Sequence, residues 1–210
     1  ARFNCTIGHY CPEETVLPVE CPVGYYMNET GAEVCTICDS GYYCIEGQIA
    51  INDTVKCDEG YFCPEGSSGP QQEPCPGGFW TGIRGTTGVD SGDNSCASCT
   101  EGFYCPPGSA SELDCPAGSY CPAESSEPLP CPAGKFGDSE NLASSSDCTT
   151  CTDGYYCEAE GLLDVSGPCD AGFYCNSTER DNIVPNPPLS ICPVGHHCEQ
   201  GSTTPARCAE

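Results

Sequence analysis

The heptapeptide Cys57-Asp58-Glu59-Gly60-Tyr61-Phe62-Cys63 carries the pattern that decides the fold of this chain. Its form is Cys-x-x-Gly-x-(Tyr/Phe/His)-Cys, and a pattern that recurs at fixed internal spacing is typical of a repeat protein. Eight copies occur, termed closed motifs below: Cys5 to Cys11, Cys38 to Cys44, Cys57 to Cys63, Cys99 to Cys105, Cys115 to Cys121, Cys151 to Cys157, Cys169 to Cys175 and Cys192 to Cys198.

Three further copies, termed openers, begin with Cys-Pro-x-Gly but lack the closing cysteine; they start at Cys21, Cys75 and Cys131. A Cys-x-x-Cys pair follows each opener after 14 to 21 residues. An opener, its pair and the next closed motifs form a larger unit. We expect a partial unit in residues 1–20, units in 21–74, 75–130 and 131–207 (the last with an extra motif), and a further start in 208–210. This division predicts a piece of a longer array, or a subunit completed by neighbours.

The composition lacks the apolar residues of an ordinary core. Leu, Ile, Val and Phe number 30 in 210 residues, the net charge is −25, and 23 residues are cysteine. Such a chain would be disordered without cross-links, whereas this cysteine density is typical of disulfide scaffolds. The expected fold class is therefore small disulfide-rich repeats in an elongated rod, with strands of two to four residues and almost no helix.

The glycine and the aromatic residues of the motif have a direct physical interpretation. Glycine allows a tight turn at positive φ, and the aromatic after it can cover the adjacent disulfide. All the Tyr, Phe and Trp residues except Phe3 lie in the motifs. His9, His196 and His197 occupy the same positions, so we interpret them as replacements for the motif aromatic rather than as metal ligands.

The repeat restricts which cysteines pair but does not fix the connectivity. An opener cysteine is expected to bond the first cysteine of the following Cys-x-x-Cys. Consecutive closed motifs are then expected to cross-pair. The alternative joins the last cysteine of a motif to the next start, such as Cys63 to Cys75, and leaves each Cys-x-x-Cys only its own awkward two-residue loop. The favoured scheme is Cys21 with Cys35, Cys75 with Cys96, Cys131 with Cys148, Cys38 with Cys57, Cys44 with Cys63, Cys99 with Cys115, Cys105 with Cys121, Cys151 with Cys169 and Cys157 with Cys175.

Five cysteines have no partner in this scheme, and an odd total requires at least one unpaired sulfur. Because the five belong to the incomplete units at the two ends, we expect them to serve as end-unit or inter-subunit cysteines. A neighbouring copy placed head to tail would complete the unit and build a homo-oligomer. The five are Cys5, Cys11, Cys192, Cys198 and Cys208.

The charge, the short apolar runs and the sequons indicate which partners and which location to expect. Six Lys and Arg against 31 Asp and Glu leave no basic face for nucleic acid. The apolar runs are far shorter than the roughly 20 residues that span a bilayer, so no membrane insertion is expected. Four Asn-x-Thr sequons predict N-glycosylation and a secreted or cell-surface location; their asparagines are Asn4, Asn28, Asn52 and Asn176.

The sequence gives little support for a metal site, a redox site or a catalytic site. Zinc binding by Cys-x-x-Cys requires reduced thiolates, and thioredoxin-like redox chemistry requires a βαβ context. Asp90 and Asp93 are close in sequence and could bind calcium weakly, but the ligand series of an EF-hand is missing. The chain contains no recognisable catalytic constellation, so we expect neither an enzyme nor a resident cofactor.

Cys-Pro-x-Gly-(Tyr/Phe), then Cys-x-x-Cys, then Gly-(Tyr/Phe)-Tyr-Cys resembles the ephrin-receptor-like cysteine-rich repeat, and more distantly the modules of tumour-necrosis-factor receptors. The resemblance covers essentially the whole chain. Tandem arrays of this kind are similar to those of mastigoneme-type extracellular filament glycoproteins. The resemblance implies a secreted, glycosylated structural protein. The alternative is a ligand-binding or adhesion module of a receptor ectodomain, which predicts an exposed apolar patch at the openers, with Trp80 as its candidate.

Overall fold

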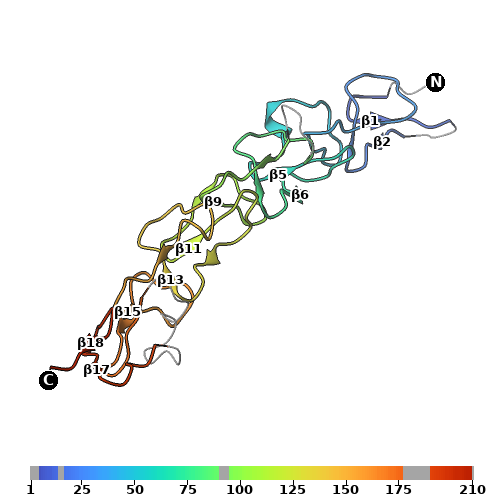
Figure 1. Ribbon diagram of the computed structural model, residues 1–210. Coiled ribbons are helices and arrows are strands. Elements are labelled where there is room, and N and C mark those ends of the chain that lie inside the picture. Colours follow the sequence, from blue (N-terminus) through green and yellow to red (C-terminus); the bar gives the residue numbers. More distant parts are fainter. Residues whose placement is uncertain (1–4, 14–16, 90–94, 177–189, 210) are drawn as a thin grey trace. The chain divides into compact units, whose positions relative to one another are not determined.

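The computed structural model describes residues 5–13, 17–89, 95–176 and 190–209, and its regular structure consists of two-residue antiparallel hairpins (Figure 1). One 3-10 turn, η1 (Asp53–Val55), is the only helical element among these residues. The hairpins are β1 (His9–Tyr10) with β2 (Val19–Glu20), β3 (Tyr25–Tyr26) with β4 (Thr36–Ile37), β5 (Tyr61–Phe62) with β6 (Glu73–Pro74), β7 (Phe79–Trp80) with β8 (Ala97–Ser98), β9 (Phe103–Tyr104) with β10 (Leu113–Asp114), β11 (Ser119–Tyr120) with β12 (Leu129–Pro130), β13 (Lys135–Phe136) with β14 (Thr149–Thr150), β15 (Tyr155–Tyr156) with β16 (Gly167–Pro168), and β17 (His196–His197) with β18 (Ala206–Arg207).

Each hairpin joins one motif to the start of the next. Its first strand holds the two residues after the motif glycine, and its second strand directly precedes the next motif cysteine. In the Cys57 motif, Tyr61 pairs with Pro74 and Phe62 with Glu73, and Cys75 follows. The small disulfide-rich fold expected from the sequence is therefore confirmed, with very short strands and almost no helix.

Backbone hydrogen bonds between successive motifs follow one scheme, seen clearly between the Cys38 and Cys57 motifs. The Gly41 N–H donates to the Cys63 carbonyl (2.7 Å), and the Gly41 carbonyl accepts from the Cys57 N–H (3.1 Å). The Cys44 N–H donates to the Ser67 carbonyl and the Gly66 N–H to the Cys38 carbonyl (both 2.9 Å). Eight junctions within the described residues have all four bonds.

Gly66 represents a second recurring site, which we term the trailing position, three or four residues after the seventh residue of a motif. Its backbone has positive φ, like that of the motif glycines. In the described part of the chain, two trailing residues with positive φ are not glycine. The trailing residues are Gly31, Gly47, Gly66, Gly85, Gly108, Glu124, Asn141, Gly161 and Gly201, with φ between 62° and 87°.

Motifs also meet their second neighbours along the chain. A Cβ atom added to Gly41 would lie 2.6 Å from the carbonyl oxygen of Gly85, which is the trailing residue two motifs later. The same relation joins Gly8 to Gly47 and Gly118 to Gly161, again at 2.6 Å. These motifs therefore bond the next motif along the chain and also lie close to the one after it.

Every closed motif is closed by a disulfide between its own two cysteines, which corrects the expected cross-pairing. The cross-links Cys38 with Cys57, Cys44 with Cys63, Cys99 with Cys115, Cys105 with Cys121, Cys151 with Cys169 and Cys157 with Cys175 are wrong. The positive φ of the motif glycine reverses the chain and brings the two Cα atoms to 5.8–6.2 Å, a distance that a disulfide spans. The observed bridges are Cys5–Cys11, Cys38–Cys44, Cys57–Cys63, Cys99–Cys105, Cys115–Cys121, Cys151–Cys157, Cys169–Cys175 and Cys192–Cys198.

The openers pair as the sequence predicts, through Cys21–Cys35, Cys75–Cys96 and Cys131–Cys148. The proposed alternative bridge from Cys63 to Cys75 is not formed. Since Cys5, Cys11, Cys192 and Cys198 bond within the chain, their expected role in linking subunits is also wrong. Cys208 alone keeps a free, exposed thiol.

Sulfur forms most of the core. Nineteen cysteines are buried, against three other hydrophobic side chains in the described residues, Met27, Val55 and Phe136. Contacts between residues divide the chain into two compact parts, which differ from the repeat units: residues 1–99 with 105–112, and residues 100–104 with 113–210. None of the described helical structure has the length and hydropathy required to cross a bilayer.

Candidate functional site

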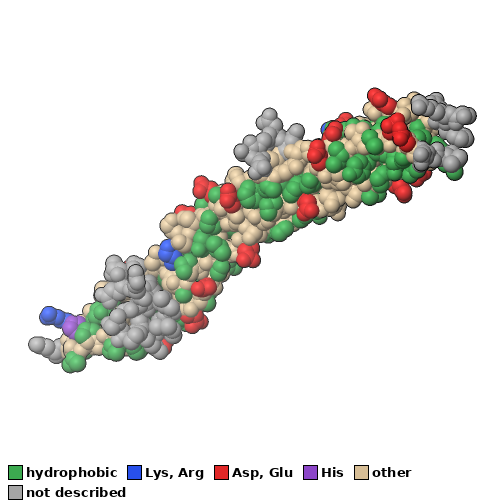
Figure 2. Space-filling view, turned by 90° about the vertical axis from the view of Figure 1, so that its right-hand side faces the viewer, with side chains coloured by type: hydrophobic (Ala, Val, Ile, Leu, Met, Phe, Trp, Pro, Cys, Tyr) green, Lys and Arg blue, Asp and Glu red, His purple; other side chains and the backbone are tan. Residues whose placement is uncertain are grey.

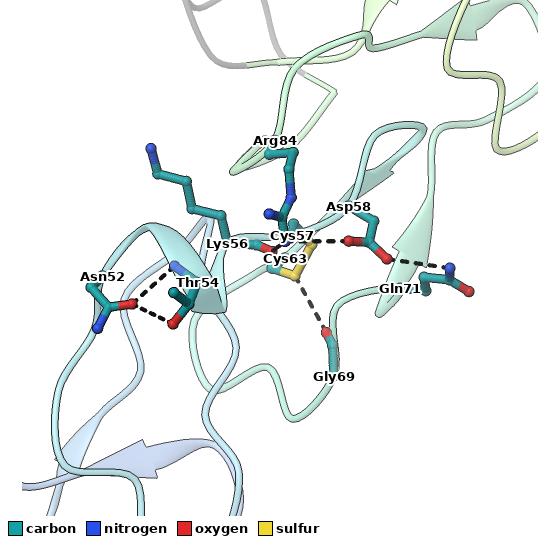
Figure 3. A network of polar contacts seen from close by, with 9 residues as sticks. All are labelled: Asn52, Thr54, Lys56, Cys57, Asp58, Cys63, Gly69, Gln71 and Arg84. Carbon is teal, nitrogen blue, oxygen red and sulfur yellow. Dashed lines mark hydrogen bonds and ion pairs between the residues drawn. A yellow bond between two sulfur atoms is a disulfide. The ribbon is translucent and has the colours of Figure 1, made fainter.

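Polar groups near the Cys57–Cys63 disulfide form a set of contacts that we term the polar clamp. Its residues are Asn52, Thr54, Lys56, Asp58, Gln71 and Arg84, drawn in Figure 3, together with Asp53. The Arg84 guanidinium donates to the Lys56 carbonyl (3.1 Å) and lies 3.5 Å from Asp58 Oδ1. The Gln71 amide donates to the other Asp58 oxygen (3.3 Å). The clamp therefore connects the segments before and after one motif to the loop of the following opener.

Lys56 places a charge and an aliphatic stem in this network. Its Nζ lies 2.7 Å from Asp53 Oδ1, and its Cγ and Cδ atoms would contact a Cβ added at Gly85. The hydrogen bond and the charge of Lys56 lower the pKa of Asp53, and Asp53 raises the pKa of Lys56 in return. Both groups are solvated, so their attraction orients the turn more than it stabilises the fold.

Asn52 caps the η1 turn and begins the sequon Asn52-Asp53-Thr54. Its Oδ1 accepts hydrogen bonds from the Thr54 backbone N–H (2.9 Å) and the Thr54 hydroxyl (2.6 Å). Because both bonds use the oxygen, the amide nitrogen points away from Thr54, as Figure 3 shows. Asn52 is also exposed, so this nitrogen is available for modification.

The other predicted sequons differ in what the structure describes. Asn28 is exposed, and no hydrogen bond joins its side chain to Thr30 among the described contacts. Asn176 is half-buried, but Ser177 and Thr178 lie outside the described residues. Asn4 also lies outside them.

Exposed large hydrophobic residues are frequent in the first three motifs and the loops beside them, and three of these residues, Val23, Tyr25 and Val34, lie in the opener that starts at Cys21. Trp80 is half-buried, its ring carbon Cζ3 lying 3.2 Å from where a Cβ on Gly82 would be. Figure 2 shows acidic side chains spread singly over the visible face, with hydrophobic side chains between them. Within residues 7–49, the exposed large hydrophobic residues are Ile7, Leu17, Val19, Val23, Tyr25, Val34, Ile37, Ile45 and Ile49.

The histidines take the places that the motif predicts. His9 lies in β1, and His196 and His197 form β17, where other motifs have aromatic residues. No group of three or more metal-ligating side chains is present in the described part of the chain. The possible calcium ligands Asp90 and Asp93 lie outside that part.

Sequence reasoning missed two features of this region. The trailing glycines could have been found, because Gly31, Gly47, Gly66 and Gly85 recur three or four residues after the seventh residue of a motif. The polar clamp had no comparable signal, because Arg84 and Asp58 are 26 residues apart and meet only when motifs stack.

No protein-family model matches the sequence, and a search of curated proteins finds no significant match. The structure itself supports a broader assignment. Eleven disulfides in 210 residues, most of them buried, require an oxidising environment to form. The chain is an extracellular disulfide-rich repeat protein.

Proposed function

We propose that this chain is a glycosylated structural segment of an extracellular filament, similar to the ephrin-receptor-like arrays of mastigoneme-type glycoproteins. One observation carries the proposal: the same four backbone hydrogen bonds recur at eight junctions. A junction that uses backbone groups accepts almost any side chains, so motifs can be added without designing a new interface. Such a repeat is suited to building length rather than to holding one ligand.

Disulfides that close within a single motif also suit a structural role in a filament. Each closed motif is stapled across six residues, so it keeps its shape when a neighbouring motif is strained. A net charge of −25 keeps the surface hydrated and opposes lateral collapse. In this proposal the motifs form a rod, copies meet head to tail, and the chain has no enzymatic role.

Electron microscopy of the native material tests the proposal. Uniform fibres, labelled along their length by an antibody against this chain, are the expected result. Dispersed single molecules under the same conditions would contradict it.

A binding module of a receptor or adhesin is the second candidate, favoured by the exposed aliphatic residues of the first three motifs. Ile37, Ile45 and Ile49 are 39%, 54% and 50% exposed. Replacing all three by Thr should leave fibres intact if the role is structural. Loss of cell-surface capture with normal fibre formation would favour the binding module instead.

A further inference from the structure

We propose that Asn52 is the sequon at which the folded chain carries an N-linked glycan, on an acceptor turn shaped by Thr54. This inference rests on the proposed extracellular function, because the glycan donor is available only on the secretory route. It goes further by selecting one asparagine among those that the sequence offers.

The first argument is the geometry of the amide. Asn52 Oδ1 is held by two donors of Thr54, at 2.9 Å and 2.6 Å, whereas Nδ2 points away from Thr54 (Figure 3) and Asn52 is exposed. Both bonds span only two residues, so the turn can form before the rest of the motif has folded. The asparagine is thus presented in the same way in the nascent and in the folded chain.

The second argument is compatibility with the finished fold. Glycosylation converts the primary amide of Asn52 to a secondary amide and leaves its oxygen as an acceptor, so both bonds to Thr54 persist. The neighbouring Lys56 side chain is turned toward Asp53 and Gly85. A sugar on Nδ2 therefore extends into solvent without breaking the polar clamp.

The reaction is a transfer from an oligosaccharide held on a lipid pyrophosphate. The bond between the anomeric carbon and the pyrophosphate oxygen breaks, and Nδ2 bonds to that carbon. One Nδ2 hydrogen leaves as a proton, and the lipid pyrophosphate departs with the bonding electron pair. No oxidant or reductant takes part.

The contrast with Asn28 gives the inference its test. Asn28 is exposed to solvent, but the structure shows no hydrogen bond between its side chain and Thr30. If exposure alone selected the site, the two asparagines would be modified equally. If the Thr54 turn matters, Asn52 will be occupied to a greater extent.

The experiment expresses the full chain in a secreting eukaryotic host and measures occupancy by mass spectrometry. A glycosidase that converts glycosylated Asn to ¹⁸O-labelled Asp marks each used site, and chymotryptic cleavage at Tyr42 and Tyr43 separates Asn28 from Asn52. We expect most secreted molecules to be labelled at Asn52, at least twofold more than at Asn28.

Three variants complete the design. Thr54→Val keeps the side-chain volume and the backbone bond but removes the hydroxyl, and it should abolish labelling at Asn52. Asn52→Asp keeps the acceptor oxygen without the amide nitrogen, so the chain should still be secreted with its disulfides formed. Asn28→Asp is the matched control and should leave Asn52 labelling unchanged.

The outcomes separate the inference from the proposed function. A secreted, fully oxidised chain with Asn52 unlabelled, or labelled no more than Asn28, overturns the inference and leaves the proposed function in place. A chain that is retained in the cell or keeps reduced thiols at the paired positions overturns the proposed function, and the inference with it.

Discussion

Replacing Gly41 by alanine tests the stacking scheme most directly. Gly41 has φ +86°, and a Cβ atom there would lie 2.6 Å from the carbonyl oxygen of Gly85. Alanine at positive φ costs about 1–2 kcal/mol. Crowding against this carbonyl oxygen, on a residue whose own N–H donates to the Cys57 carbonyl (3.0 Å), adds about 1–3 kcal/mol. We therefore expect Gly41→Ala to lower the free energy of unfolding by about 2–5 kcal/mol.

Two other glycines of the same unit separate these contributions. Gly31 has φ +80°, but a Cβ atom there would have no neighbour within 4 Å, so Gly31→Ala should cost only about 1–2 kcal/mol. Gly69 has neither positive φ nor a close neighbour, and Gly69→Ala should change stability by less than about 1 kcal/mol. A loss of stability that is largest at Gly41, smaller at Gly31 and smallest at Gly69 would show that close approach adds to backbone strain.

Guanidinium unfolding with the disulfides intact, followed by fluorescence of the sole tryptophan, Trp80, measures all three variants. Mass spectrometry of the non-reduced proteins first verifies that each variant has its eleven bridges. Equal losses for Gly41→Ala and Gly31→Ala would refute the contact between second-neighbour motifs. A loss at Gly69 as large as that at Gly41 would refute the whole glycine argument.

Three further outcomes follow from named contacts. Complete tryptic cleavage of the unfolded, non-reduced chain should release the peptide ending at Lys56, whereas the cross-pairing of closed motifs would keep it bonded to the peptide starting at Cys57. Glu124→Gly relieves a positive φ of 62° and should stabilise the chain by about 0.5–1 kcal/mol in thermal unfolding. Asn141→Gly should not stabilise it, because the Asn141 side-chain amide donates hydrogen bonds to two oxygens, at 2.9 and 3.0 Å, which glycine would lose. In an NMR titration, Lys56→Met should return the lowered pKa of Asp53 toward 3.8. In the unmodified chain the ion pair is present at neutral pH and is lost as the pH falls through the Asp53 pKa. An Asp53 pKa that the substitution leaves unchanged would argue against the contact.

The sequence contains most of the information on the repeat but little on which motifs meet. Spacing alone is enough to place the motifs and the opener bridge Cys75–Cys96, and it predicts very short strands, but it does not give the strand pairing. The cross-pairing prediction failed because closure of a motif on itself was not considered, although a tight turn at positive φ was expected at motif glycines such as Gly60. The structure uses this residue to reverse the chain and bring Cys57 to Cys63.

The polar clamp shows what pattern reasoning cannot supply. Arg84 meets the Lys56 carbonyl only because the motifs stack at a particular rise and rotation, and no spacing rule encodes that geometry. The sequon at Asn52 was visible in the sequence, but the hydrogen bonds to Thr54 that distinguish it from Asn28 were not.

Closure of each motif on itself also shapes how the protein can be made. When a closed motif emerges during synthesis, its second cysteine appears six residues after the first, and the correct partner is already the nearest thiol. Oxidation can therefore proceed from the N-terminus onward, and only openers such as Cys21 and Cys75 must wait for a partner farther along. Twenty-three cysteines would allow an enormous number of wrong pairings, but an array oxidised in order of synthesis meets few of them. Such a chain can be lengthened by adding motifs without making its oxidation harder.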